Sequence, residues 1–493
     1  MALAVAIALI ALVPAARILT HRAVWREVQF RPWLALAGAV ALLAMLAALA
    51  RAWPLPMVIV PTAVSVLVIL TTFATWRARD TYGASRKLPP GSLSLRTSLD
   101  ALTDPRFYAR TAAQYGPVFK MAQFHRPVAC IVDLPLGLEL LARQRETLRD
   151  PTLPFGRRSP GDLVAFLDDD QHVRHRPVLR TALTGNAIAQ CQDGVANIVQ
   201  AELVRAAREH THDGLDPRRL LDRVTFASVC HVLLGYPAGD STIGALRPLI
   251  TSRNLGDGKD MLSQAVALVR STGSTPDEHP VLAALMRDDP RHLDDDVVLG
   301  NLVLIAHVTR SNIRGVLGWT LKELLDHPKL VNALRGAATS GHPPAVNELA
   351  TRIVQETLRL HQSEFFYREV TTDLQAGPYR IPRGWLVRVC VRECHDNPAV
   401  FPEPRVFRPE RFIGRRYERT EYCPFSDGTH TPAGPELTMM VARTFATVLA
   451  LHWNGHITRD GPIERDGNRH WNHWRPGSGL RVRLMTRSGP PED

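Results

Sequence analysis

The segment Pro424-Phe-Ser-Asp-Gly-Thr-His-Thr-Pro-Ala-Gly434 decides the fold of this 493-residue chain once it is set beside two shorter segments that precede it. The first is Glu356-Thr-Leu-Arg359, whose opposite charges are three residues apart and therefore lie on one face of a helix. The second is Pro409-Glu-Arg-Phe412. An exposed ion pair alone contributes only about 0.5 kcal/mol, so the information lies in the order and spacing of the three segments.

In that order the segments resemble those of the cytochrome P-450 family of haem-thiolate proteins. Shorter matches extend the resemblance over nearly all of residues 87–485: Pro89-Pro90, Leu324-Leu-Asp-His-Pro328, Asp373, Ile381-Pro-Arg-Gly384 and Pro398-Ala-Val-Phe-Pro402. The resemblance implies a mainly α fold with a smaller β region. It also implies that Glu356, Arg359 and Arg411 form a buried triad that braces the core on the haem side.

The haem loop of that family has the form Phe-x-x-Gly-x-x-x-Cys-x-Gly, in which the cysteine is the axial ligand of iron. Phe425, Gly428 and Gly434 match this form, and His430 occupies the usual basic position, which implies contact with a haem propionate. Pro432 stands where the cysteine belongs. Proline has no sulfur and no backbone N–H, whereas thiolate donation is what favours O–O cleavage in these proteins.

Two residues near the loop are alternatives to the missing ligand. Cys423 lies outside the loop and is a poor substitute, and His430 could reach the iron only if the loop were remodelled. We therefore expect a haem pocket in which axial ligation is weakened or absent.

The oxygen-activating segment of the long helix is altered as well. By the resemblance it falls on Val308-Thr-Arg-Ser-Asn-Ile313, so that Ser311 occupies the acid position and Asn312 the alcohol position. A proton relay needs groups that can give up and accept protons. Ser311 and Asn312 can hydrogen-bond, but no carboxylate remains to supply protons, and no catalytic residue is assigned.

Other positions that face haem in the family keep suitable residues. His172 and Arg176 match a His-x-x-x-Arg pair, and Arg368 resembles a further propionate contact. A cationic helix face is the alternative interpretation of the first pair, since Arg174 and His175 adjoin it. Several cationic donors could hold the carboxylates of a porphyrin without an axial thiolate, at lower affinity.

Recognisable motifs of other chemistries are missing from the sequence. Cys390-Val-Arg-Glu-Cys-His395 is one residue longer than the Cys-x-x-Cys-His of covalent haem attachment, and we interpret it as ordinary strand and loop. There is no P-loop, no dinucleotide-binding glycine fingerprint after a strand and no zincin helix. The sequence therefore predicts no metal ligand.

The first part of the chain has the composition of a membrane anchor. Three stretches contain no charged residue: Ala2–Ala16, Trp33–Ala50 and Ala52–Trp76. A bilayer core needs about 20 apolar residues per helix, so residues 1–79 are expected to hold two or three transmembrane helices, the first stretch being a short span or a signal peptide. Residues 80–493 are expected to form the P-450-like haem domain.

Charge distribution gives the orientation and excludes one class of partner. Residues 1–79 carry +6 of the formal net charge of +11, contributed by arginines beside the apolar stretches. This location argues against nucleic acid as the partner. Most of these arginines lie between the first two stretches or after the third, so the positive-inside rule places the large domain in the cytoplasm. The six cysteines are then expected to be reduced thiols.

The large domain is expected to be mostly helical between about residues 182 and 320. Its longest helix runs from Val297 to Asp326, and a second runs from Asn347 as N-cap to about Leu360. Short strands are predicted within Tyr115–Lys120, Pro127–Val132 and Tyr379–Val387.

Two functions remain open at this point. In the first, the protein is a degenerate, non-catalytic accessory that binds a partner enzyme or a lipophilic ligand at the membrane. In the second, it is a haem-dependent monooxygenase that acts on a hydrophobic small molecule with electrons from a redox partner. The departures at Pro432, Ser311 and Asn312 favour the accessory function.

Overall fold

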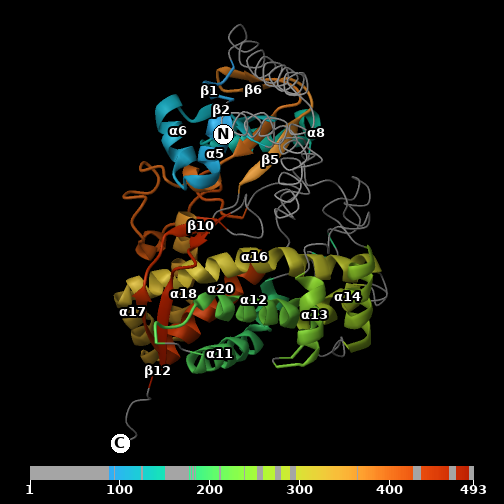
Figure 1. The fold of residues 1–493 in the computed structure, drawn as a ribbon, viewed down its shortest axis with the longest axis vertical. Helices are drawn as coiled ribbons and strands as arrows, with labels where there is room; N and C mark the ends of the chain where they lie inside the picture. Colours follow the sequence, from blue (N-terminus) through green and yellow to red (C-terminus); the bar gives the residue numbers. More distant parts are fainter. Residues whose placement is uncertain are drawn as a thin grey trace, which may run out of the picture. The chain divides into compact units, whose positions relative to one another are not determined.

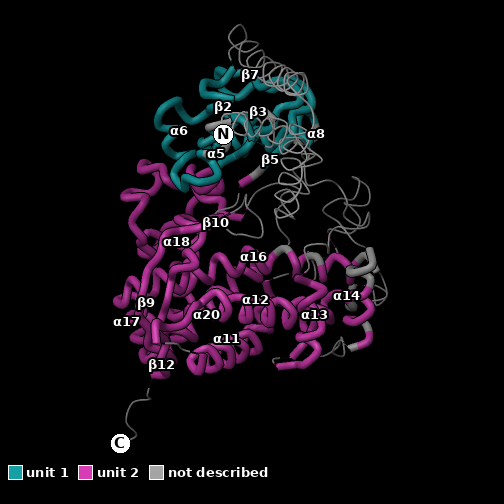
Figure 2. Tube along the Cα trace, in the orientation of Figure 1, with its two compact units in different colours: residues 1–157, 366–390 teal, residues 158–365, 391–493 magenta. Residues whose placement is uncertain are grey.

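The computed structural model describes the following residues of the chain: 88–93, 95–123, 126–149, 177, 179, 183, 185–209, 212–237, 239–251, 259–272, 279–288, 296–362, 365–425, 435–465 and 473–487. The anchor expected at residues 1–79 lies outside these ranges. Among the helices that are described, none combines the length and the apolar character needed to cross a membrane. The chain divides into two compact units, which we describe separately (Figure 2).

The first unit holds the main sheet and comprises residues up to 157 together with residues 366–390. Its described elements are β1 (Gly91–Ser92), α5 (Leu95–Thr103), α6 (Phe107–Tyr115), β2 (Val118–Gln123), β3 (Arg126–Ile131), α7 (Leu134–Ala142), α8 (Gln144–Thr147), β4 (Leu148–Arg149), β5 (Phe366–Val370), β6 (Leu374–Ala376), β7 (Tyr379–Ile381) and β8 (Leu386–Val389).

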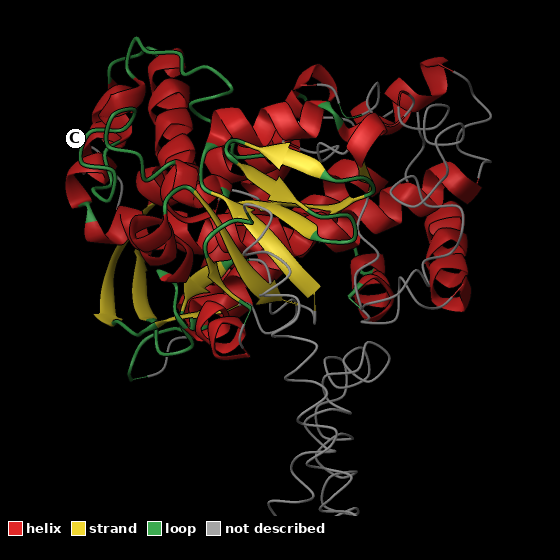
Figure 3. Cartoon of the chain, turned by 90° about the horizontal axis from the view of Figure 1, so that it is seen from above, coloured by secondary structure: helices red, strands yellow, loops and turns green. Residues whose placement is uncertain are grey.

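The sheet of this unit has six strands in the order β1-β2-β3-β8-β5-β4 (Figure 3). β1 pairs with β2 in parallel and β3 pairs with β8 in parallel, whereas β2–β3, β5–β8 and β4–β5 are antiparallel. The central strands are rich in valine, isoleucine and leucine and are almost wholly buried, as expected for strands covered on both faces. The predicted strands near residues 118 and 128 are confirmed as β2 and β3, and the predicted segment 379–387 contains β7 and the start of β8.

Helix α7 approaches this sheet closely because of one glycine. Asp133 caps the helix by accepting a hydrogen bond from the backbone N–H of Leu136 at 2.9 Å. A Cβ atom at Gly137 would lie 2.5 Å from Cγ1 of Val389 on β8. A larger residue at this position would therefore force the helix away from the strand.

The second unit is mainly helical and comprises residues 158–365 and 391–493. Its described helices are α10 (Gly185–Ala189), α11 (Gln192–Arg208), α12 (Pro217–Leu234), α13 (Thr242–Ile250), α14 (Lys259–Thr272), α15 (Pro280–Asp288), α16 (Asp296–Asp326), α17 (Pro328–Thr339), α18 (Pro343–Thr357), the π-helix η3 (Leu358–Gln362), α19 (Val391–Cys394), the 3-10 helix η4 (Pro409–Phe412) and α20 (Pro435–His452). Its strands are β9 (Trp453–Arg459), β10 (Ile463–Arg465), β11 (Trp474–Pro476) and β12 (Arg481–Thr486), paired as β9–β12 and β10–β11.

The long helix α16 extends across this unit from α17 to α14 (Figure 1). It packs against α12, α18 and α20, and α11 packs in turn against α12 and α20. Apolar side chains from all these helices form one continuous core, which also takes in β9 and β12. Because α16 is covered on several sides, its apolar residues are not confined to one stripe.

The helix boundaries test two sequence predictions. The long helix predicted from Val297 to Asp326 is confirmed, since α16 ends at Asp326 and Pro328 begins the next helix. The prediction that Asn347 caps the second helix is wrong. That helix, α18, begins at Pro343, because a proline at the first helical position loses no intrahelical hydrogen bond.

Candidate functional site

The charged residues of the segment Glu356–Arg359 meet Arg411 in the interior of the second unit. Oε2 and Oε1 of Glu356 accept hydrogen bonds from Nε and Nη2 of Arg359 at 2.7 and 2.9 Å. Oε1 also accepts one from Nε of Arg411 at 2.9 Å. The side chains of Glu356 and Arg359 are fully buried and that of Arg411 is 3 % exposed. The structure thus brings these three residues together.

Backbone carbonyl groups accept further hydrogen bonds from the two arginines. Arg359 donates to the carbonyl oxygens of His395 and Pro404 at 3.1 and 2.7 Å. Arg411 donates to those of Pro402 and Val406, both at 3.1 Å. Two cations share one carboxylate here, and the carbonyl dipoles compensate for the second positive charge.

The chemistry of this cluster is structural. Arginine does not lose its proton in proteins, and both oxygens of Glu356 are engaged, one of them by the backbone N–H of Arg408 at 3.0 Å as well. Such a carboxylate is fully buried and occupied by its partners within the fold. The cluster instead fastens α18 and η3 to the irregular segment 395–411.

His395 is a further buried anchor of that segment. Its Nε2 accepts a hydrogen bond from the backbone N–H of Cys423 at 3.1 Å. Burial, assisted by the positive charge of Arg359, lowers the pKa of His395 to about 3. The ring is therefore neutral at pH 7 and holds the segment that leads into residues 426–434. Sequence reasoning missed this role, since it considered His395 only within the Cys390–His395 segment.

The helix α16 carries the two positions expected for oxygen activation. Ser311 and Asn312 lie in its middle and are both half-buried. One turn further along, a Cβ at Gly315 would lie 2.7 Å from Nε2 of Gln362 in η3. Asn312 and Gly315 lie on one face by their spacing, so the expected alcohol position belongs to the face of α16 that η3 approaches.

A ring stack and two hydrogen bonds continue this interface between α16 and η3. The rings of Trp319 and His361 stack with centroids 3.8 Å apart. His361 Nε2 donates to Oε1 of Glu323 at 2.7 Å, and Nε1 of Trp319 donates to the carbonyl oxygen of Trp474 at 2.8 Å. Burial lowers the pKa of His361, although the carboxylate of Glu323 opposes the shift. The interface holds η3, and with it Arg359, in one position.

Arg310 belongs to an ion-pair network with α12 that sequence reasoning did not foresee. Asp222 of α12 accepts hydrogen bonds from Arg310 at 2.9 Å, from Arg247 at 2.6 Å and from Arg314 at 3.4 Å. Burial lowers the pKa of Arg310, and the two neighbouring arginines add to the effect. The side chain of Arg310 is thus directed to α12, where Asp222 balances its charge.

Arg368 is described in the first unit, on strand β5. It is 6 % exposed, and its Nη1 donates to the carbonyl oxygen of Tyr367 at 2.8 Å. On the same sheet Arg388 stacks over the ring of Tyr108 at 4.2 Å and donates to the hydroxyl of Tyr367. Burial raises the pKa of Tyr367 to about 12. Arg368 thus adjoins a buried polar cluster in this unit.

The remaining predicted site residues fall outside the described ranges. They are His172, Arg176, His430 and Pro432. All six cysteines of the chain, in contrast, are described, and all are buried free thiols: Cys130, Cys191, Cys230, Cys390, Cys394 and Cys423. None of them lies between residues 424 and 434, so the loop contains no thiol.

In a comparison with protein-family models, residues 103–245 and 286–465 match the model described as Cytochrome P450. Two similar curated proteins are plant enzymes. Abscisic acid 8'-hydroxylase 3 of Oryza sativa subsp. indica is 27% identical over 401 residues, which cover 72% of this chain and 78% of that protein. Abscisic acid 8'-hydroxylase 1 of Arabidopsis thaliana is 24% identical over 398 residues, which cover 73% and 84%.

A comparison with solved structures supports the same fold. The structure described as retinoic acid bound cyanobacterial CYP120A1 superposes with a TM-score of 0.68 and 21% sequence identity. The match covers 82% of this chain and all of that chain. At this level of identity the likeness concerns the fold alone.

Proposed function

The chain belongs to the cytochrome P450 family, whose model matches well over half of it, and we propose that it is a membrane-anchored, catalytically degenerate member that acts as an accessory protein. In this proposal the haem pocket is partly retained. The protein binds a partner enzyme or a lipophilic ligand at the membrane and does not activate oxygen.

The absence of a thiol from the loop carries this proposal. Pro432 occupies the position of the axial cysteine, and every cysteine of the chain is a buried thiol elsewhere in the fold. The nearest, Cys423, has its backbone fixed to His395. Haem held by a thiolate supplies the family's oxygen chemistry, and this donor set does not fit that mode of ligation. We therefore derive no oxygen-activating step.

The residues of α16 support the same proposal. A relay that delivers protons to bound oxygen requires a group with an exchangeable proton of suitable pKa. Ser311 and Asn312 can position water or a ligand by hydrogen bonding, but neither titrates in the physiological range. The acid and the thiolate both serve oxygen activation, so their joint absence is consistent with the loss of that one activity.

The cationic residues fit a weaker association with haem. We propose that His172, Arg176, Arg368 and His430 are the residues that would face the carboxylates of a porphyrin. Charge-assisted hydrogen bonds to these carboxylates would hold the group in place. Without an axial thiolate the affinity is expected to be low, so the purified protein should contain less than one haem per chain.

We further propose that residues 1–79 anchor the protein in a membrane and that residues 80–493 form the domain in the cytoplasm. The uncharged stretches and the flanking arginines of the first 79 residues support this placement. A partner enzyme in the same membrane, or a hydrophobic molecule dissolved in it, would then meet the domain at the lipid surface.

The proposal is tested by the spectrum of the detergent-solubilised full chain. We expect little haem, and in the reduced carbon monoxide difference spectrum no Soret band of the thiolate type. A thiolate-type band would contradict the assignment of Pro432, because it requires a sulfur ligand.

The substitution Pro432→Cys tests whether the loop is otherwise intact. Restoring the sulfur should raise haem content and create a thiolate-type carbon monoxide band. Pro432→Ser is the matched control, since it removes the proline without adding a thiol. If both variants behave alike, more than the ligand has been lost.

The second candidate function is a haem-dependent monooxygenase that acts on a hydrophobic small molecule with a redox partner. It is favoured by the names of the compared proteins, which are abscisic acid hydroxylases and a complex with retinoic acid. These two acids are therefore the first ligands to test. Turnover of either one with a reducing system by the unmodified chain would replace the accessory proposal, whereas saturable binding without turnover would support it.

A further inference from the structure

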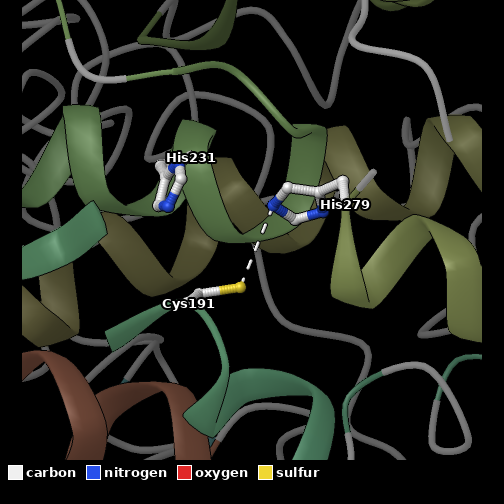
Figure 4. Close-up of side chains that lie close together, drawn as sticks. All are labelled: Cys191, His231 and His279. Carbon is white, nitrogen blue, oxygen red and sulfur yellow. Dashed lines mark hydrogen bonds between the residues drawn. The ribbon is translucent and has the colours of Figure 1, made fainter. Parts of the chain in front are cut away.

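Three side chains that carry metal-binding atoms meet in the helical unit, apart from the residues assigned to haem (Figure 4). They are Cys191, His231 and His279, and the cysteine sulfur and one ring nitrogen of each histidine all lie within 4.8 Å of one another. The sulfur of Cys191 is 3.9 Å from Nε2 of His279. Cys191 and His279 are buried and His231 is half-buried.

Each of the three residues is held by a different helix of the core. Cys191 immediately precedes α11, His231 lies in the last turn of α12, and His279 immediately precedes α15. Helices α11 and α12 pack against each other, and α15 packs against α12. The cluster therefore lies where three chain segments that are distant in sequence converge.

The imidazole of His231 is oriented for binding through Nε2. Its Nδ1 donates a hydrogen bond to the carbonyl oxygen of Tyr236 at 2.8 Å, the arrangement that commonly orients a metal-binding histidine. Nε2 then carries the lone pair. The ring fits beside α11 only because residue 194 is glycine, since a Cβ there would lie 2.1 Å from Nε2.

The position of Cys191 favours a thiolate only when a cation is present. It is the residue before the first turn of α11, where the helix dipole stabilises negative charge. Its thiol contacts the carbonyl oxygen of Ala187 at 3.6 Å. Burial nevertheless raises the pKa of the Cys191 thiol to about 11, so without a metal the group stays protonated.

Burial shifts the pKa of His279 downward, opposite to that of Cys191, and these shifts do not favour a catalytic cysteine–histidine pair. Burial, with a smaller contribution from His231, lowers the pKa of His279 to about 4. A nucleophilic pair needs a thiolate beside a protonated imidazole, whereas here both partners are neutral at pH 7. A neutral imidazole is, however, the form that binds metals.

We propose that Cys191, His231 and His279 bind one zinc-class divalent metal ion, as three ligands that connect the start of α11, the end of α12 and the start of α15. A thiolate with two imidazoles is a ligand set suited to zinc, and a water molecule would complete four-coordination. In tetrahedral geometry the ligand atoms lie about 3.5 Å apart. The contact of 3.9 Å is close to this spacing, and small side-chain rotations would bring the other pairs to it.

The unmodified full chain gives the first test, with Co²⁺ as the spectroscopic probe. Co²⁺ should bind with one ion per chain and produce the near-ultraviolet charge-transfer absorption of a sulfur–cobalt bond, and Zn²⁺ should displace it. Metal bound without this absorption, or no saturable binding, would overturn the proposal whatever the variants do. Zinc and iron are quantified separately, so that haem does not contribute.

Two pairs of variants give the second test. Cys191→Ala should weaken Zn²⁺ binding by more than about 100-fold, as expected for loss of a direct ligand. Cys230→Ala is its control, because Cys230 is an equally buried thiol on α12 outside the cluster. Gly194→Ala should also weaken binding by displacing His231, whereas Gly244→Ala, where a Cβ meets nothing within 4 Å, should not.

Equal Zn²⁺ affinity in Cys191→Ala and in the unmodified chain would overturn the proposal. If Cys191→Ala or Gly194→Ala fails to fold, His279→Gln replaces it, since it removes a ligand and retains a polar side chain of similar length. Folding of each variant is verified by circular dichroism and thermal unfolding in the presence of a chelator. Under that condition a ligand variant should unfold at nearly the temperature of the unmodified chain.

Discussion

At the scale of single residues, the second unit contains a cluster of buried charges, Glu356, Arg359 and Arg411, that are paired with one another. Glu356 is the one carboxylate between two buried guanidinium groups, and it also accepts a backbone N–H. Such a cluster contributes little net free energy compared with an apolar core. Removing only one of its charged groups nevertheless lowers stability strongly, because the remaining charges stay buried without compensation.

Glu356→Gln should therefore lower the free energy of unfolding by about 3–5 kcal/mol, since it leaves Arg359 and Arg411 without a counter-charge. Chemical denaturation followed by circular dichroism measures this loss. Glu348→Gln is the matched control on the same helix, because Glu348 is exposed and lies 3.9 Å from its partner Arg352. Its effect should be below about 0.5 kcal/mol. Equal effects of the two substitutions would contradict the structural role of the triad.

His395 should make stability depend on pH. Its pKa is lowered to about 3 in the folded chain, against an ordinary value of about 6.5 when unfolded. Between these values the unfolded chain binds the proton and the folded chain does not. The contribution to stability is therefore fully present above pH 6.5 and decreases by up to about 1.4 kcal/mol per pH unit as the pH falls towards 3.

Denaturation at pH 7 and at pH 5 measures this effect. His395→Gln retains an acceptor for the N–H of Cys423 but cannot be protonated, so the loss of stability between the two pH values should be smaller by about 2 kcal/mol. His212→Gln is the control, because this side chain is fully exposed. An unchanged pH dependence in His395→Gln would show that His395 is not buried as a neutral ring.

At the scale of elements, the contact between α16 and η3 positions both the triad and the expected oxygen-activation site. Gly315 and Gly318 lie in the same helix but meet different surroundings. A Cβ at Gly315 would clash with the buried amide of Gln362 at 2.7 Å, whereas a Cβ at Gly318 would meet Leu221 at 3.6 Å, an ordinary contact. The two glycines thus allow a matched comparison.

Gly318→Ala should stabilise the protein by about 0.5–1 kcal/mol, because alanine is the better helix former. Gly315→Ala should lose that gain and destabilise by roughly 1 kcal/mol as Gln362 is displaced. The difference in melting temperature between the two variants measures how closely η3 packs against Gly315 of α16. If Gly315→Ala is as stable as Gly318→Ala, η3 does not approach α16 as closely as described.

The same elements show how far the sequence could predict the structure. The boundary of α16 followed from local signals, the acids at residues 294–296 and Pro328, which act on the backbone beside them. The predicted N-cap of α18, Asn347, was wrong by five residues because Pro343 was not weighed as a first helical residue, which makes His342 the cap. The π-helix η3 could not be predicted, since it depends on the packing of Gly315 and Trp319 of α16 against it.

The site residues also divide into those that sequence motifs predict and those that only packing between distant segments brings together. The triad could be expected from the order of motifs, but its carbonyl partners between residues 395 and 406 could not, because an irregular loop has no sequence period. Likewise the positions of Cys191, His231 and His279 along the sequence match no known metal-binding motif. Only the packing of three helices brings them together.

At the scale of the whole molecule, the question is where a chain of net charge +11 resides. More than half of this charge lies in residues 1–79, interleaved with uncharged stretches, and the remaining 414 residues carry the smaller share. Two kinds of membrane association are compatible with such a distribution. Arginines could attract anionic lipids at the surface, or the apolar stretches could insert and the arginines only orient them.

Salt separates these two cases, because surface attraction is screened within about 10 Å at 0.1 M ionic strength whereas burial of apolar helices is not. We expect the full chain to remain in the membrane fraction after washing with concentrated salt and with alkaline carbonate. Replacing the seven arginines of residues 1–79 by glutamine should change orientation but not retention. Deleting residues 2–79 should release the domain. Release of the full chain by salt alone would instead assign the membrane binding to the arginines and would contradict the proposed anchor.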